Sequence, residues 1–125
     1  ISVSTFTEPK DLLKFIKKRS EELHEKKCCA NYTLLAHSSL KHIAGIGKKD
    51  IYQIITELKY VSELTPENIN TEWDENLQFS SILAFKGLEN HHIILALKKE
   101  DYLKCFELYI GMSRAIISLE LLILE

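Results

Sequence analysis

Short apolar runs alternate with segments of helical spacing along this chain, and this alternation restricts the possible folds more than any other feature. Four nearly continuous apolar runs cover residues 32–36, 79–85, 92–97 and 116–124. Runs of this length are typical of strands that are buried on both faces of a parallel sheet. Because parallel neighbours need a crossover connection, the pattern predicts an α/β fold with helices between the strands of a mostly parallel sheet.

Three segments have the apolar spacing of amphipathic helices, at about residues 8–27, 51–58 and 100–115. The packed face of the first segment comprises Leu12, Phe15, Ile16, Arg19 and Leu23. Thr5 and Glu8 fit a capping box at its start, and Pro9 fits the first helical turn. Residues 3–6 have the alternation of a strand, and the polar stretch 62–76 is expected to be a long loop.

The composition describes one globular domain and excludes some functional classes. Of the 125 residues, 46% are apolar and 27% are charged, so a single folded domain over 1–125 is expected. The 16 basic and 18 acidic residues give a net charge of −2, which excludes an overall basic surface. Any contact with nucleic acid must therefore be local. No apolar run is long enough to span a membrane, so no membrane partner is expected.

Cysteine usage indicates a reducing compartment. Cys28, Cys29 and Cys105 are odd in number and two of them are adjacent, so all three are expected to be free thiols in a cytoplasmic protein. Neither CxxC nor HxxxH spacing occurs, and no metal site is expected. The sequence opens at Ile1 without a signal peptide, which indicates a piece of a longer polypeptide.

Two short strings combine glycine with charged side chains at positions that strand and helix packing does not require. They are FKGLE at 85–89 and YIGMSRA at 109–115. In this order they resemble motifs V and VI of the second RecA-like motor domain in UvrD-like, or Rep-like, superfamily 1 DNA helicases. The run 32–39, which ends in His37 and two serines, is similar to the motif IV strand of that domain. The likeness covers residues 30–125 loosely and residues 79–125 well.

This resemblance implies a RecA-like three-layer sandwich of the P-loop NTPase type that lacks its own phosphate loop. In such motors ATP lies between two RecA-like domains, and the second domain supplies an arginine finger that stabilises charge on the transferred phosphoryl group. By the resemblance, Arg114 is the catalytic finger and Tyr109 lies beside it. Glu89 faces the nucleotide, and Gly87 gives the turn dihedral angles that a Cβ would oppose.

The same resemblance implies contacts with nucleic acid and with another domain. Lys86 and the hydroxyls of Ser80 and Ser81 are expected near the nucleic-acid backbone or the interdomain cleft. The expected partners are single-stranded DNA and an N-terminal RecA-like domain of the same polypeptide. The isolated chain should bind single-stranded DNA weakly, with an affinity that falls steeply as salt rises.

The chain contains no GxxxxGK[ST] phosphate loop, and GIGKK at 45–49 is too short and lacks the hydroxyl that would hold Mg²⁺. ATP with Mg²⁺ is therefore expected only in the full-length parent, and no cofactor is expected on this chain alone.

Two positions depart from the family pattern. Leu83 stands where a His commonly reaches nucleic acid, and Ile116 stands after Arg-Ala where a basic residue is common.

Other interpretations of these residues stay open. A non-catalytic binding or scaffold module could keep the RecA-like fold after losing motor function. The GIGKK string also looks like a helix-hairpin-helix turn, in which Lys48 and Lys49 would add charge beside a DNA phosphate. Arg114 could instead cap the end of a helix, and Lys86 could be an ordinary surface lysine.

Overall fold

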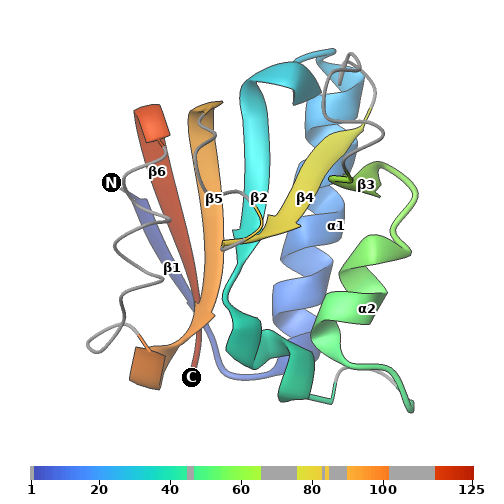
Figure 1. Ribbon diagram of the computed structural model, residues 1–125, viewed down its shortest axis with the longest axis vertical. Coiled ribbons are helices and arrows are strands. Elements are labelled where there is room, and N and C mark those ends of the chain that lie inside the picture. The colour runs from blue at the N-terminus through green and yellow to red at the C-terminus, as the bar shows by residue number, and fades with distance from the viewer. Residues whose placement is uncertain (1, 45–46, 66–75, 83, 85–89, 102–114) are drawn as a thin grey trace.

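The computed structural model describes residues 2–44, 47–65, 76–82, 84, 90–101 and 115–125. Within these ranges six strands form one sheet in the order β1-β6-β5-β2-β4-β3, and all hydrogen-bonded neighbours are parallel (Figure 1). The strands are β1 Ser2–Phe6, β2 Tyr32–Ala36, β3 Val61–Glu63, β4 Leu77–Ser81, β5 Asn90–Lys98 and β6 Ala115–Leu124. The predicted α/β class with a parallel sheet is confirmed, and the arrangement is consistent with a RecA-like domain.

Two α-helices, α1 (Pro9–Glu25) and α2 (Ile51–Thr56), cover one face of the sheet (Figure 1). Three short 3₁₀ helices are η1 (Cys29–Asn31), η2 (Ser38–His42) and η3 (Lys99–Asp101). The first predicted helix is confirmed, with proline in its first turn. Its predicted capping box is wrong, because Glu8 is the N-cap residue and no side chain caps the helix. The helix expected over 100–115 lies almost wholly outside the described residues.

The sheet is buried on both faces, because successive residues of each central strand point in opposite directions. One apolar cluster lies between the sheet and the two helices and includes Ile16, Leu34 and Phe79. A second cluster lies on the opposite face and includes Leu35 and Leu95, both fully buried. This two-sided burial is the reason that the strand sequences are continuous apolar runs.

The boundaries of two predicted elements change in the structure. β4 ends at Ser81 rather than at 85, because the Ala84 amide donates a hydrogen bond to the Ser81 hydroxyl, 3.2 Å away, in a local turn. β3 lies at the start of the predicted loop 62–76 and pairs with the first half of β4. This strand has three residues and one buried apolar side chain, Val61, so it has no detectable alternation.

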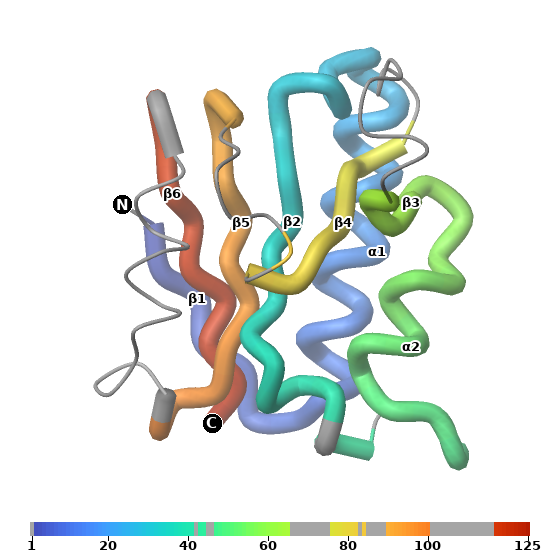
Figure 2. Tube along the Cα trace, in the orientation of Figure 1, coloured from blue at the N-terminus to red at the C-terminus, as the bar shows by residue number. Residues whose placement is uncertain are grey.

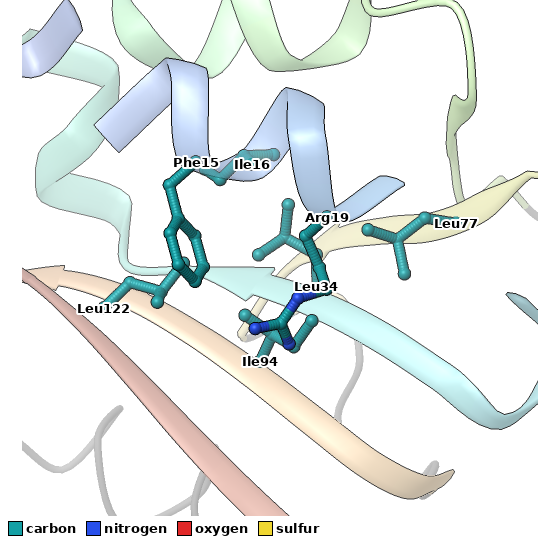
Figure 3. Close-up of a pocket in the computed structure, with 7 residues that line it drawn as sticks. All are labelled: Phe15, Ile16, Arg19, Leu34, Leu77, Ile94 and Leu122. Atoms are coloured by element: carbon teal, nitrogen blue, oxygen red, sulfur yellow. The ribbon is translucent and has the colours of Figure 1, made fainter. Parts of the chain in front are cut away.

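Arg19 joins α1 to the sheet through a pair with Glu120 of β6. The two terminal nitrogens of the guanidinium lie 2.5 and 3.0 Å from the two carboxylate oxygens, in the bidentate geometry of a strong pair. Figure 3 shows Arg19 extending from α1 toward the sheet beside Phe15. The crevice around these side chains has apolar walls and no room for a water molecule, so it is packing rather than a binding site.

Because all strands are parallel, they end at one edge of the sheet and begin at the other. We call these the carboxyl edge and the amino edge. Figure 2 shows β2, β5 and β6 running in the same direction, with η2 following β2 at the carboxyl edge. Ligands of open parallel sheets bind beyond the carboxyl ends of the strands, so this edge is the first place to look for a site.

Candidate nucleic-acid interface

The end of β2 lies between the ends of β4 and β5. Ala36 pairs with Ser81 on one side and with Ala96 on the other. The His37 amide donates to the Ala96 carbonyl at 2.9 Å, and the Ile82 amide donates to the Ala36 carbonyl at 3.3 Å. The segments that follow β2 and β4 therefore leave the sheet side by side.

The turn after β2 is fixed by the side chain that begins it. His37 is only 7% exposed, and its Nδ1 accepts a hydrogen bond from the Ser39 amide at 3.1 Å and lies 2.9 Å from the Ser39 hydroxyl. Because Nδ1 is an acceptor here, the neutral ring carries its proton on Nε2. The capped turn becomes η2, which carries the exposed Lys41.

Tyr52, in the first turn of α2, contacts two other elements, β4 and η2. Its ring packs on Phe79 of β4, with centroids 4.7 Å apart and planes at 51°. The ammonium of Lys41 from η2 lies 4.8 Å from the same ring centroid, which is the geometry of a cation–π contact. Its hydroxyl forms hydrogen bonds with the side chain and the backbone of Ser81. We call Lys41, Tyr52, Phe79 and Ser81 the Tyr52 cluster.

The environment of Tyr52 keeps its phenol neutral. Burial raises the pKa of Tyr52, the negative charge of Glu63 at the end of β3 raises it further, and the hydrogen bonds with Ser81 oppose the change. A neutral phenol retains a proton that it can donate. Because the bonds with Ser81 lower the pKa, the phenol oxygen of Tyr52 accepts them at the end of β4.

The turn before α2 is closed by backbone pairing and a side-chain cap. Ala44 and Asp50 form an antiparallel bridge, and the Asp50 carboxylate accepts from the Gln53 amide at 2.7 Å, which caps α2. Gly47 has φ +64°, a backbone conformation that glycine adopts without strain. A helix-hairpin-helix needs an α-helix before such a turn, whereas the described residues there form the 3₁₀ helix η2. The structure therefore does not match that alternative.

The structure describes four of the predicted site residues. Ser80 is 2% exposed and its hydroxyl donates to the Ser81 carbonyl at 2.9 Å, so direct contact between this hydroxyl and a nucleic acid is not compatible with the structure. Ser81 is half-buried at the carboxyl edge. Lys48 is exposed, and the Lys49 ammonium forms an ion pair with Glu57 at 2.7 Å. The other predicted residues lie outside the described ranges: Lys86, Gly87, Glu89, Tyr109 and Arg114.

Sequence reasoning missed Lys41 and the hydroxyl of Tyr52. Helical spacing assigned Tyr52 to a packed helix face, and no signal indicated that its hydroxyl reaches the end of β4. Lys41 follows the strand that resembles motif IV by five residues, in a turn that is not periodic. Only the folded arrangement brings the two side chains together.

The amino edge carries a different set of aromatic and charged side chains. His24 at the end of α1 stacks on Tyr60 with centroids 3.9 Å apart, and the Lys59 ammonium lies 5.3 Å from the Tyr60 ring centroid. These residues line an open groove together with Glu21, Glu25 and Lys27. Nearby strand ends add a second stack, between Tyr32 and His92, with centroids 4.5 Å apart.

Some classes of site find no support in the part of the chain that the structure describes. There, no three His, Cys, Asp or Glu side chains come together as a group that could hold a metal ion. Among the described residues, Cys28 and Cys29 form no disulfide, and Cys105 lies outside the described ranges. No helix in the described ranges is both long and apolar enough to cross a membrane.

Comparisons with known proteins give a structural likeness and no match by sequence. No protein-family model and no curated protein matches the chain. One solved structure that matches is the C-terminal domain of a possible DNA helicase from Lactobacillus plantarum WCFS1, with a TM-score of 0.69 and 14% identity. The match covers 98% of this chain and 73% of that one. The chain therefore has the fold of that helicase C-terminal domain over nearly its whole length.

Proposed function

We propose that this chain is the C-terminal RecA-like motor domain of an ATP-dependent, UvrD-like DNA helicase. Its fold is that of a domain from a protein described as a possible DNA helicase. The strings FKGLE and YIGMSRA stand where the family resemblance requires them, one between β4 and β5 and the other ending at the start of β6. Fold and motif order thus support the same proposal independently.

The observation that carries the proposal is the register of two neighbouring strands. Asn90, the first residue of β5, pairs with Ala115, the first residue of β6. Glu89 and Arg114 directly precede these paired residues in the chain, and paired parallel strands lie about 5 Å apart. The two residues that the resemblance assigns to the nucleotide are thus next in sequence to paired residues of adjacent strands, and both lie outside the described ranges.

In the proposed mechanism an N-terminal RecA-like domain supplies the phosphate loop and the Mg²⁺ ligands. Arg114 then presents a planar, permanently charged fork to the transferred phosphoryl group, with Tyr109 beside it. Glu89 contacts the nucleotide, and Gly87 allows the turn that precedes it. Single-stranded DNA crosses the carboxyl edge, where Ser81 of the resemblance is joined by Lys41.

Steady-state ATP hydrolysis by the full-length polypeptide tests this proposal. The polypeptide upstream of this chain should contain a GxxxxGK[ST] phosphate loop, and its ATP hydrolysis should be stimulated by single-stranded DNA. The 125-residue chain alone should hydrolyse no ATP. An upstream region without a phosphate loop would instead favour a non-catalytic RecA-like binding module, for which the departures at Leu83 and Ile116 would be the first signs.

A further inference from the structure

The first residue of β5 is held in place by its own side chain. The Nδ2 group of Asn90 donates to the Ala30 carbonyl at 3.1 Å and to the Thr33 hydroxyl at 3.0 Å. Its Oδ1 accepts from the His91 amide at 2.8 Å. The amide nitrogen and the amide oxygen of this side chain therefore both have partners. Through these bonds Asn90 fixes the start of β5 against η1 and β2.

The Thr33 hydroxyl extends this link across the sheet. Thr33 is fully buried, and its hydroxyl accepts from Asn90 and donates to Gln78 Oε1 at 2.8 Å. The three side chains come from β5, β2 and β4, which are neighbours in the sheet. Hydrogen bonds in such a chain polarise and strengthen one another. The position of Asn90 is thus set by two other strands.

The start of β6 has one more residue than the matching part of β5. Asn90 pairs with Ala115 and His92 pairs with Ser118, so three steps along β6 correspond to two steps along β5. This extra residue is a β-bulge. Bulges are frequent beside active sites, where they change the direction in which a side chain points. The bulge begins at the residue that directly follows Arg114 in the chain.

A side-chain contact holds β5 and β6 together where the bulge ends. His92 Nδ1 and the Ser118 hydroxyl lie 2.5 Å apart and share a hydrogen bond. The His92 ring stacks on Tyr32 of β2, with centroids 4.5 Å apart and planes at 19°, and this stack orients the imidazole. From this pair onward the register of β5 and β6 is regular. Ser118 therefore fixes where the regular part of β6 begins.

We propose that the starts of β5 and β6 are built to position the residues that precede them for ATP hydrolysis. Asn90 is the positioning residue for Glu89, to which it is directly bonded in the chain. Ser118 is the positioning residue for Arg114, because it fixes the bulge through which the chain continues into β6. The inference rests on the proposed function, since only the resemblance assigns Glu89 and Arg114 to the nucleotide. It adds two residues to which the resemblance gives no role.

ATP turnover at saturating ATP and affinity for a non-hydrolysable ATP analogue, both measured on the full-length polypeptide, test the two roles. Ser118→Ala should lower turnover per folded molecule by about tenfold with affinity within about twofold of wild type, because a displaced catalytic group slows the reaction without weakening ground-state binding. Ser118→Thr keeps the hydroxyl and should restore most of the turnover. Asn90→Ala should weaken the affinity by about fivefold, because Glu89 contacts the nucleotide in the proposed mechanism.

The start of β3 and the residue before β4 offer matched controls. Asn76 Nδ2 donates to the Ser62 hydroxyl at 2.7 Å, and neither residue is next in sequence to one that the resemblance assigns to the nucleotide. Asn76→Ala and Ser62→Ala remove the same chemical groups as Asn90→Ala and Ser118→Ala. They should lower the melting temperature to a similar extent but change turnover and nucleotide affinity by less than about twofold.

The outcomes separate this inference from the proposed function. If Arg114→Lys lowers turnover but Asn90→Ala and Ser118→Ala behave like the two controls, the positioning roles are wrong and the motor-domain proposal stands. Equal losses of turnover in the controls, or a Ser118→Thr variant as slow as Ser118→Ala, would also overturn the positioning roles. If the full-length polypeptide hydrolyses no ATP, the inference and the proposed function fail together.

Discussion

The two edges of the sheet carry the same pair of residue types in two different settings. At the carboxyl edge the Lys41 ammonium lies 4.8 Å from the ring centroid of Tyr52, and at the amino edge the Lys59 ammonium lies 5.3 Å from that of Tyr60. The hydroxyl of Tyr52 reaches the end of β4, whereas the ring of Tyr60 stacks on His24 of α1. The rest of the environment, rather than the pair itself, decides what each lysine can do.

Substitutions at the two edges should therefore change different properties of the protein. Changes in the Tyr52 cluster should alter nucleic-acid binding, because its cation and hydroxyl face the proposed DNA path. Changes around Tyr60 should alter stability only, because this ring braces the end of α1 against the start of β3. Changes at the start of β6 should alter ATP chemistry.

The largest expected effect concerns the two arginines of the chain. In the full-length polypeptide, Arg114→Lys should lower the rate of ATP turnover by about 10³-fold while nucleotide affinity stays nearly unchanged, because a lysine lacks the planar fork. Arg19→Lys is the matched control, since Arg19 pairs with Glu120 under α1 and should affect melting temperature rather than turnover per folded molecule. Normal turnover in Arg114→Lys would end the finger assignment.

Charge reversal at the two lysines compares the edges directly. Lys41→Glu should weaken oligo(dT) binding by more than about tenfold, because an attractive phosphate contact becomes a repulsive one. Lys59→Glu makes the same change in net charge at the amino edge and should weaken binding by about twofold or less once salt screens distant charges. Equal losses in the two variants would mean that DNA binding depends on net charge and not on the carboxyl edge.

Removing the hydroxyl of Tyr52 or of Tyr60 should lower the free energy of unfolding by different amounts. Tyr52→Phe should lower the free energy of unfolding by about 1 kcal/mol, the usual value of one partly buried hydrogen bond. For Tyr60, the described contacts are made by its ring, so Tyr60→Phe should cost less than about 0.5 kcal/mol. Urea denaturation of both variants checks this order. A larger loss of unfolding free energy for Tyr60→Phe would contradict the claim that the hydroxyl of Tyr52 is the one that is hydrogen-bonded.

The smallest expected effect is a dependence of stability on alkaline pH. The pKa of Tyr52 is raised in the folded state, mainly by burial, so the folded state holds the phenolic proton more tightly than the unfolded state does. The resulting stabilisation is complete below about pH 10 and is lost as pH rises through the folded-state pKa. The stability difference between wild type and Tyr52→Phe should therefore shrink as the pH rises above about 10. A constant difference over that range would contradict the buried phenol.

Much of the fold could be predicted from the sequence because two-sided burial leaves a strong signal. The runs that become β2 and β5 are apolar at almost every position, since both faces of these central strands are covered. β3 left no such signal, because an edge strand of three residues buries a single apolar side chain. The length of β4 was also overestimated, because the turn that ends it depends on a hydroxyl contact three residues away.

The candidate site was less predictable, since its parts are distant in sequence. Family resemblance assigned Ser80 and Ser81 the same role, but Ser80 is buried in the interior whereas Ser81 is only half-buried. Strand alternation explains the difference, because adjacent residues of β4 point to opposite faces of the sheet. Lys41 and Tyr52 could not be paired from the sequence, because their contact depends on how η2 and α2 pack at the end of β2.

Hydrogen exchange of the chain with and without oligo(dT) tests the central claim most directly, namely that the carboxyl edge is the nucleic-acid face. At low salt and saturating oligonucleotide, peptides that cover residues 37–44 and 80–84 should exchange more slowly in the complex. Peptides from the amino edge, residues 24–31 and 57–61, should exchange at unchanged rates. Protection confined to the amino-edge peptides, or absent from the carboxyl-edge peptides of a chain that has bound the oligonucleotide, would contradict the account.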